Sequence, residues 1–249
     1  MRIAVAGGTG VVGTHVVETA RARGHDVVVL ARATGVELLS GAGLPEAIVG
    51  TDTVIDVSNV NTLKPDVSVS FFAGATRNLL KAGVAAGVTH HLALTIVGAE
   101  STPYGYYAGK LSQERLIEAG DVAWTILRAT QFHEFAAMMY VRAKAGPVHA
   151  APRARIQPVA AREVAEHLVA LAEAGPGGRV AEIAGPREES LADMVRTYAH
   201  AIGRRGWMPD LSLPGSFGRA MRGGSLLPGP DAILGRQTFA EWVEALPDA

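Results

Sequence analysis

The chain has 249 residues, of which 48% are hydrophobic and 19% charged, with a formal net charge of -1 and no cysteine. The lack of cysteine excludes disulfides, thiolate-bound zinc, iron–sulfur clusters and a cysteine nucleophile. The small net charge argues against the basic surface typical of nucleic-acid-binding domains. No apolar run approaches the ~20 residues of a membrane span, and no signal sequence precedes the first strand-like run. We therefore expect a cytoplasmic protein with a small-molecule substrate and without a nucleic-acid or membrane partner.

The first half of the chain alternates short apolar runs with runs of helical spacing. Strands are expected at 3–6, 27–31, 53–57, 91–97 and 123–128, and helices at 14–23, 44–49, 67–86 and 110–119. The valine-rich run at 27–31 is typical of a strand buried on both faces of a parallel sheet. Gly24 and Gly87 follow two of the helices and suit left-handed C-terminal caps. Such alternation predicts right-handed βαβ units, with ligands at the carboxyl ends of the strands.

The second half is less regular. Helices are expected at 132–143, 162–174 and 191–202, the last with Ser190 as its N-cap, a strand at 180–184, and loops with short extended pieces at 146–155. The fold class is thus predicted as α/β, a Rossmann-type doubly wound parallel sheet with a small C-terminal substrate-binding lobe. We expect one domain over 1–249, with a core of about 1–135 plus 156–185 and a lobe of about 136–155 and 186–249.

A glycine-rich loop lies between the first predicted strand and the first predicted helix. Gly7 permits a tight turn, Gly10 a close approach to a pyrophosphate, and Gly13 close helix–strand packing. The helix N-terminus then offers free N–H groups to phosphates. The alternative is a glycine-rich turn without a ligand. The residues predicted to contact the cofactor here are Gly7, Thr9, Gly10, Val11, Val12 and Gly13.

The end of the second predicted strand indicates the type of nicotinamide cofactor. An NAD site usually has a carboxylate there to bind the ribose 2′-OH, whereas this strand ends at Ala31 and Arg32. The permanently charged, forked guanidinium of Arg32 suits the 2′-phosphate of NADP, with Thr34 as a nearby hydroxyl donor. We favour NADP(H). NAD(H) stays open, because arginine also stacks on adenine, as does a merely solvated Arg32.

Tyr106 and Lys110 have the i, i+4 spacing that places two side chains on one face of a helix. A phenol with its ordinary pKa of about 10 is a poor acid. A neighbouring ammonium lowers that pKa, so that the phenol can exchange a proton with a carbonyl or alcohol oxygen. Tyrosine–lysine pairs also arise by chance, and Tyr107 is an alternative pocket residue.

These motifs resemble the short-chain dehydrogenase/reductase superfamily. The segments 105–114 (GYYAGKLSQE) and 124–135 (WTILRATQFHEF) resemble its atypical NmrA-like NAD(P)-binding family, and shorter matches at 54–59, 156–159 and 183–186 extend the likeness over nearly the whole chain. The resemblance implies a tyrosine–lysine pair in which Lys110 also holds the nicotinamide ribose, and a hydroxyl helper, here Thr95 where many relatives carry serine. It also implies further cofactor contacts at Val57, Ser58, Asn59 and Phe132.

Several further residues are candidates for the substrate pocket. His133 stands where the family commonly has an aromatic or apolar residue, and its near-neutral pKa suits a general base. The other candidates are Met138, Tyr140, Trp207 and Phe217. No metal site is expected, because His90 and His91 lack a third ligand at useful spacing.

The resemblance implies an NAD(P)-dependent oxidoreductase acting on a carbonyl or quinone of a small, largely apolar molecule. Tyr106 would be the acid, Lys110 its electrostatic partner and Thr95 an oxygen clamp. One alternative is an oxygenase of the same fold that tailors an aromatic polyketide, with His133 removing a proton. Another is a non-catalytic dinucleotide-sensing regulator. The oligomeric state is open, and a homo-oligomer is compatible with the sequence.

Overall fold

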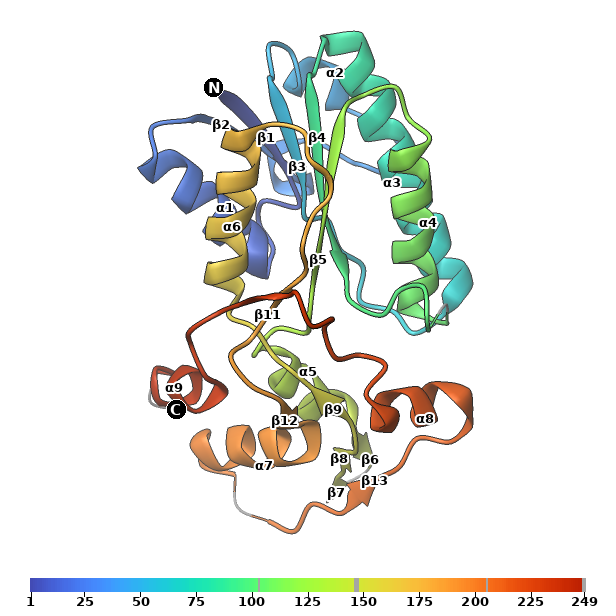
Figure 1. Cartoon of the computed structure of the whole chain (residues 1–249), viewed down its shortest axis with the longest axis vertical. Helices are drawn as coiled ribbons and strands as arrows, with labels where there is room; N and C mark the ends of the chain where they lie inside the picture. Colours follow the sequence, from blue (N-terminus) through green and yellow to red (C-terminus); the bar gives the residue numbers. More distant parts are fainter. Residues whose placement is uncertain (103, 146–147, 205, 248–249) are drawn as a thin grey trace. The chain divides into compact units, whose positions relative to one another are not determined.

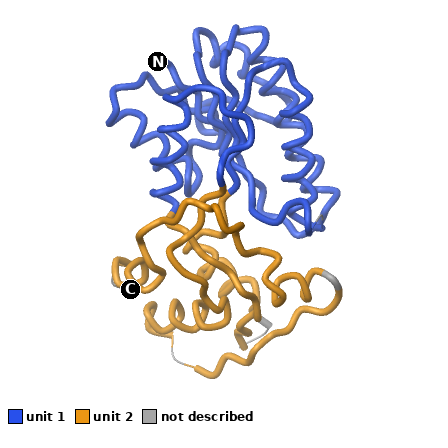
Figure 2. Tube along the Cα trace, viewed as in Figure 1, with its two compact units in different colours: residues 1–128, 161–181 blue, residues 129–160, 182–249 orange. Residues whose placement is uncertain are grey.

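The structure is a computed structural model that describes residues 1–102, 104–145, 148–204 and 206–247. Its contacts divide the chain into two compact units (Figure 2). Unit 1 consists of Met1–Arg128 and Ala161–Ala181, and unit 2 of Ala129–Ala160 and Glu182–Ala249. Residues 129–135, 156–160 and 182–185, expected in the core, group with unit 2. Each unit is described by itself.

Unit 1 is built around a parallel sheet. Its strands are β1 (Arg2–Ala6), β2 (Asp26–Leu30), β3 (Thr53–Asp56), β4 (His90–Ile96), β5 (Trp124–Ala129) and β10 (Gly178–Arg179). The strand order is β2-β1-β3-β4-β5, and β10 pairs with β5. Strand β1 pairs in parallel with β2 and β3, and β3 with β4, so the carboxyl ends of these strands lie at one edge.

Helices cover both faces of this sheet (Figure 1). Helices α1 (Val11–Ala22) and α6 (Ala161–Ala174) pack together on one face, and α3 (Pro65–Ala86) and α4 (Tyr106–Glu118) on the other. Gly24 and Gly87 adopt positive φ at the ends of α1 and α3, as predicted. The short helices η1 (Arg32–Thr34) and α2 (Leu44–Ala47) lie between β2 and β3. The Rossmann-type α/β fold predicted from the sequence is confirmed.

The valine-rich strand β2 differs from the prediction. It lies at the edge of the sheet, and Val27, Val28 and Val29 are only half-buried, whereas Leu30 is buried. The chain between β2 and β3 forms helical turns instead of another strand, and within the described residues β2 is the last strand on this side of the sheet. The prediction of burial on both faces was therefore wrong, because helices cover the edge of a sheet less completely than its centre.

Unit 2 contains helices and short ladders. The helices are α5 (Phe135–Arg142), α7 (Leu191–Ala201), α8 (Gly215–Gly223) and α9 (Phe239–Glu244). The ladders join β6 (Lys144–Ala145) to β7 (Val148–His149), β8 (Ala151–Pro152) to β13 (Asp210–Leu211), β9 (Arg155–Ile156) to β12 (Glu189–Ser190), and β11 (Ile183–Ala184) to β14 (Ile233–Leu234). Helix α7 packs against α5 and α9.

Two local predictions for unit 2 have different outcomes. Ser190 caps α7, and its hydroxyl accepts the Asp193 N–H, as predicted. The strand expected at 180–184 is instead interrupted. Only residues 183–184 form a strand, β11, in which Ile183 pairs with Ala129, and the preceding strand β10 ends at residue 179.

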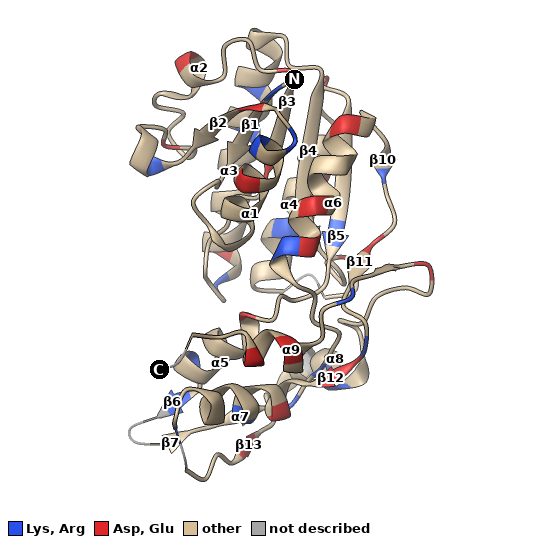
Figure 3. Cartoon of the chain, turned by 90° about the vertical axis from the view of Figure 1, so that its left-hand side faces the viewer, with Lys and Arg blue, Asp and Glu red and all other residues tan. Residues whose placement is uncertain are grey.

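Charged side chains of both signs are interspersed along either unit (Figure 3). Across the described parts of the chain, no helix has both the length and the apolar character that crossing a membrane requires.

Candidate functional site

The glycine loop follows β1 and contacts the carboxyl ends of two neighbouring strands, β2 and β3. The Gly7 N–H donates to Leu30 O at 3.0 Å, and Gly7 has φ 80°. A Cβ on Gly7 would lie 2.7 Å from Ser58 Cα, and a Cβ on Gly13 would lie 2.1 Å from Gly7 O. Both positions are therefore restricted to glycine by close backbone contact, as the sequence argument required of a turn that packs helix against strand.

Ser58 follows β3 and forms one wall of this loop. Its N–H donates to Asp56 Oδ1 at 2.9 Å. Ser58 is 3% exposed, yet its Oγ has no hydrogen-bond partner among the described residues. Leaving a buried hydroxyl unsatisfied costs about 1–3 kcal/mol, so a ligand that bonds to it is stabilised. Val57 before it is buried, and Asn59 after it is exposed.

The start of α1 is open to a ligand. Gly10 is the N-cap and has no side chain to satisfy the first amides, and the helix has no acid in its first turn. The nearest atom to a Cβ on Gly10 would be Gly7 O at 3.3 Å. Thr9 and Val11 are exposed and Val12 is buried. Free amides at the positive end of the helix dipole suit a pyrophosphate, so this loop fits a dinucleotide.

Of the two side chains predicted to contact a 2′-phosphate, Arg32 can bind a ligand, whereas the Thr34 hydroxyl is already hydrogen-bonded to the backbone. Arg32 begins η1 directly after the buried Ala31, is exposed, and its guanidinium pairs with none of the residues that the structure describes. The hydroxyl of Thr34 lies 2.7 Å from Val29 O and 2.9 Å from Ala31 O, and accepts the Ala31 N–H at 3.2 Å. The Thr34 hydroxyl thus caps the end of β2, while the Arg32 guanidinium is free to bind an anion.

Tyr106 is the first residue of α4 and is half-buried. Its ring contacts Phe72 edge-on, with centroids 5.5 Å apart, and its carbonyl oxygen accepts the Ser68 hydroxyl at 2.9 Å. Burial, together with the nearby Tyr107 and Asp56, raises the pKa of the Tyr106 phenol above its ordinary value. The prediction that a neighbouring ammonium lowers this pKa was therefore wrong, because burial dominates and the Lys110 ammonium bonds to Leu94 O and Gln113 Oε1 instead. The phenol is protonated at neutral pH and can act as a hydrogen-bond donor.

Lys110 shares the helix with Tyr106 but is directed inward. It is 4% exposed, and its Nζ donates to Leu94 O and to Gln113 Oε1, both at 2.9 Å. The ammonium also lies 4.2 Å from the centroid of the Phe72 ring. Burial lowers the pKa of Lys110 to about 8, against the opposing effect of Asp56 and Glu114.

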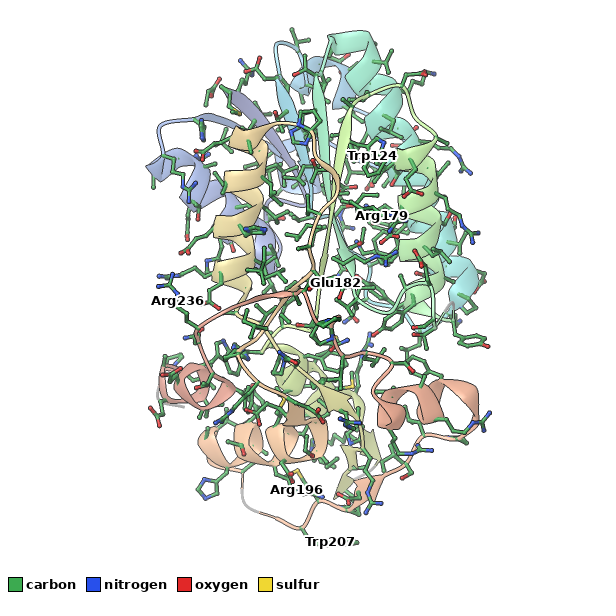
Figure 4. The ribbon with its side chains drawn as sticks, viewed as in Figure 1. Trp124, Arg179, Glu182, Arg196, Trp207 and Arg236 are labelled. Atoms are coloured by element: carbon green, nitrogen blue, oxygen red, sulfur yellow. The ribbon has the colours of Figure 1, made fainter. Side chains whose placement is uncertain are left out.

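Thr95 on β4 is held by a buried carboxylate. Its hydroxyl donates to Glu114 Oε1 at 2.6 Å. Glu114 also accepts Arg128 through Nε at 2.9 Å and Nη2 at 2.6 Å, and Arg179 through Nη1 at 3.0 Å. Arg179 lies beside α4 (Figure 4). Burial raises the pKa of Glu114, but the hydrogen bonds and charges of its partners outweigh it and lower the pKa overall.

The predicted substrate residues, together with Phe132, all belong to unit 2. His133 is fully buried, with its Nε2 3.2 Å from Gln237 O and its ring 5.9 Å from the rings of Phe239 and Trp242. Phe132, Met138 and Phe217 are half-buried.

A cavity of about 540 Å³ lies within unit 2 and is lined in part by Tyr140, His149, Trp207 and Met208. The rings of Tyr140 and His149 stack at 4.1 Å. Trp207, which is labelled in Figure 4, is 82% exposed. Tyr140 and Trp207 are thus the two predicted substrate residues that the structure places at one cavity. Tyr106, Lys110 and Thr95 belong to unit 1, and the roles of all these residues stay predictions.

Sequence reasoning missed the buried polar residues near Lys110, namely Asp56, Gln113 and Glu114, and the half-buried Arg128 that pairs with Glu114. One signal was present: Asp56 and Arg128 are charged residues within otherwise apolar predicted strands, and charged groups are rarely buried unless paired. Glu114 also follows Lys110 by four residues, on the same helix face.

Comparisons with known proteins agree with this geometry. A family model described as NAD(P)H-binding matches residues 7–174. No curated protein gives a significant sequence match. Among solved structures, MoeE5 in complex with UDP-glucose and NAD has 18% identity and a TM-score of 0.70, with 98% of each chain covered.

Two other solved structures are comparably similar. An Agrobacterium tumefaciens short-chain dehydrogenase/reductase superfamily protein with bound NAD has 19% identity and a TM-score of 0.67, covering 98% of this chain and 95% of that one. An Escherichia coli NADPH-dependent quinone oxidoreductase has 19% identity and a TM-score of 0.67, covering 97% and 98%. At these identities the likeness shows the fold.

Proposed function

The chain belongs to a family of NAD(P)H-binding proteins, and we propose that it is an NAD(P)-dependent oxidoreductase that reduces a carbonyl or quinone of a small, largely apolar molecule. The observation that carries this proposal is a juxtaposition at the carboxyl edge of the unit 1 sheet. There the glycine loop follows β1, and Ser58, whose hydroxyl lacks a partner among the described residues, follows β3. Tyr106, whose phenol is protonated, is the first residue of the helix after β4.

The chain's own residues would hold the cofactor as follows. The amides at the start of α1 bind the pyrophosphate, and Gly10 lets it approach. The Ser58 hydroxyl bonds to the dinucleotide, and the free guanidinium of Arg32 pairs with a 2′-phosphate, which favours NADP(H) over NAD(H). When bound, the reduced nicotinamide supplies a hydride, that is two electrons and one hydrogen, to the acceptor carbon.

Tyr106 would supply the matching proton. The acceptor oxygen takes the phenolic proton while the acceptor carbon gains hydrogen, and the resulting phenolate recovers a proton from water. The raised pKa of Tyr106 makes its phenol a weaker acid than a free tyrosine, so the proposal requires the acceptor oxygen to become strongly basic before the proton moves. Lys110 supplies positive charge on the same helix. For Thr95 to clamp the acceptor oxygen, its hydroxyl must turn away from Glu114.

The acceptor class is proposed from a similar structure. The similar Escherichia coli structure is named as an NADPH-dependent quinone oxidoreductase. This name favours a quinone as the first acceptor to test.

The test is to mix the purified protein with NADPH or NADH and a panel of quinones and carbonyl compounds, and to follow nicotinamide oxidation. We expect Tyr106→Phe to lower kcat by about 10²–10⁴-fold, the usual contribution of a general acid, with an unchanged cofactor Kd. Tyr104→Phe, at a tyrosine that is 49% exposed, is the matched control and is expected to leave turnover unchanged. Full turnover in Tyr106→Phe would refute the assigned acid.

One observation favours a second candidate, the non-catalytic dinucleotide-sensing regulator. Thr95 and Lys110 both bond inward, to Glu114 and to Gln113 and Leu94, as structural residues do. Tight cofactor binding without turnover on any acceptor would support this candidate over the oxidoreductase. Substrate-dependent oxygen uptake without nicotinamide oxidation would instead indicate the polyketide-tailoring oxygenase.

A further inference from the structure

A buried chain of hydrogen bonds runs from the acid–base helix to the glycine loop. Lys110 Nζ donates to Gln113 Oε1 at 2.9 Å, and Gln113 Nε2 donates to Asp56 Oδ2 at 2.8 Å. The other carboxylate oxygen, Oδ1, accepts the Ser58 N–H at 2.9 Å. Lys110 is 4% exposed, and Gln113 and Asp56 are fully buried. All four residues belong to unit 1.

Only one assignment of donors and acceptors satisfies every hydrogen bond in this series. An ammonium only donates, and an ionised carboxylate only accepts. Gln113 lies between them and must accept with its oxygen on the Lys110 side and donate with its nitrogen on the Asp56 side. Because the three side chains are buried, water cannot replace a lost partner without cost.

The Ser58 end of this series of hydrogen bonds forms one wall of the proposed dinucleotide site. Asp56 holds the Ser58 amide, and the Ser58 backbone lies so near Gly7 that a Cβ there would be 2.7 Å from Ser58 Cα. A small shift of Ser58 therefore changes the width of the glycine loop and moves the orphaned Ser58 Oγ. Asp56 also influences the acid–base residues, because its charge acts on both Tyr106 and Lys110.

We propose that Asp56 and Gln113 are positioning residues, which hold Ser58 in place against the glycine loop for the bound dinucleotide and hold the Lys110 side chain in place on the inner side of α4, the helix that also carries Tyr106. Both side chains are fully buried, so their expected effect on the dinucleotide passes through Ser58 and Lys110. The inference rests on the proposed function only for dinucleotide binding and is independent of hydride transfer.

Three variants test this inference through the donor–acceptor order. Asp56→Asn keeps the acceptor for the Ser58 amide but turns an N–H₂ donor toward Gln113 Nε2, so two donors face each other. Gln113→Glu keeps the acceptor for Lys110 but places two carboxylates face to face. In the double variant, which combines both substitutions, the new amide at position 56 donates to the new carboxylate at position 113. Lys110 donates to the other oxygen of that carboxylate, so the whole order returns with unchanged net charge.

Two readouts follow, and neither requires turnover. One is the Kd of NADPH from its fluorescence, and the other is hydrogen exchange of the backbone amides around Ser58 in the free protein. We expect each single variant to bind NADPH about tenfold more weakly, the factor for the loss of one buried charged hydrogen bond, and to exchange faster at Ser58. The double variant is expected within about threefold of the wild-type Kd. Asp66→Asn, at an exposed acid in α3, is the control and is expected to match the wild type.

Wild-type Kd and exchange in the single variants would overturn the inference, and so would a double variant as weak as the two losses combined. If a single variant fails to fold, recovery of a folded, NADPH-binding double variant supports the same order, and a double variant that also fails contradicts it. If the single variants bind NADPH more weakly and the double variant recovers, but no acceptor is turned over, the oxidoreductase proposal is refuted and this inference stands. If an acceptor is turned over but the variants bind NADPH like the wild type, this inference is refuted and the oxidoreductase proposal stands.

Discussion

The buried carboxylate of Glu114 gives the sharpest stability prediction. Its side chain is fully enclosed, while its partners Arg128 and Arg179 are 17% and 37% exposed. Glu114→Gln keeps the shape of the side chain but removes the charge and leaves one oxygen for three donors. With the amide oxygen in place of Oε1, Thr95 and Arg128 Nε keep their acceptor, but the NH₂ group faces Arg128 Nη2 and Arg179 Nη1, which also donate. With the amide turned the other way, Arg128 Nε faces the NH₂ group, donor against donor.

The magnitude follows from burial and from the remaining partners. Breaking a buried ion pair by removing one partner usually costs about 3–5 kcal/mol. Arg128 keeps its contact with Glu100 at 2.7 Å, and Arg179 is more than a third exposed, so the lower end applies. We therefore expect Glu114→Gln to lower the free energy of unfolding by about 3 kcal/mol. For a chain of this size that corresponds to a fall in Tm of about 6–12 °C.

The assay is urea unfolding at neutral pH, followed by circular dichroism, with Glu118→Gln as the matched control. Glu118 is 32% exposed and bonds to the same Arg179 at 2.7 Å, so its loss is expected to cost at most about 1 kcal/mol. If the two variants unfold within about 0.5 kcal/mol of each other, the reasoning from burial is refuted.

Three further predictions concern the cofactor and pH. Arg32→Ala is expected to weaken NADPH binding by about tenfold or more and to leave NADH binding unchanged. Arg21→Ala, at an exposed arginine, is the control and is expected to change the binding of neither cofactor. Equal losses of affinity for both cofactors in Arg32→Ala would contradict a 2′-phosphate contact. Gly10→Ala is expected to fold normally but to bind the dinucleotide at least about tenfold more weakly, while Gly13→Ala loses stability as well, since its Cβ meets Gly7 O at 2.1 Å; thermal melts and NADPH titrations separate the two. Burial, with the neighbouring His91, lowers the pKa of His90 from 6.5 to about 4. Between pH 7 and pH 5, His90 therefore becomes protonated in the unfolded chain but stays neutral in the folded chain. About 2 kcal/mol of stability is expected to be lost over that interval, and a His90→Gln protein that loses as much on acidification as the wild type would exclude this origin.

The sequence could predict the parts of the site that depend on local conformation. Gly7 and Gly13 were identified because a tight turn and close helix packing each require glycine at a fixed spacing, and Ser190 because a helix N-cap is formed within a few residues. The parallel sheet followed from the alternation of apolar strands and helices.

Properties set by distant neighbours could not be predicted in this way. The valines of β2 carry no sign that their strand lies at the edge of the sheet. Thr95 was correctly noted as a hydroxyl on β4, but its acceptor lies 19 residues away on α4, and no local pattern identifies that acceptor. Lys110 likewise has the expected spacing from Tyr106, yet its inward direction depends on where Leu94 and Gln113 lie after folding.

The path of the chain through its two units has a consequence for biosynthesis. The chain passes from one unit to the other three times, so neither unit is a continuous segment that ends before the other begins. Helix α1 ends at Ala22 and packs against α6, which begins only at Ala161. At 5–20 residues per second a ribosome needs roughly 7–28 s to make the intervening segment. During that interval the face of α1 that will contact α6 stays uncovered by α6, so this part of the unit 1 core can close only after residue 174 has been made.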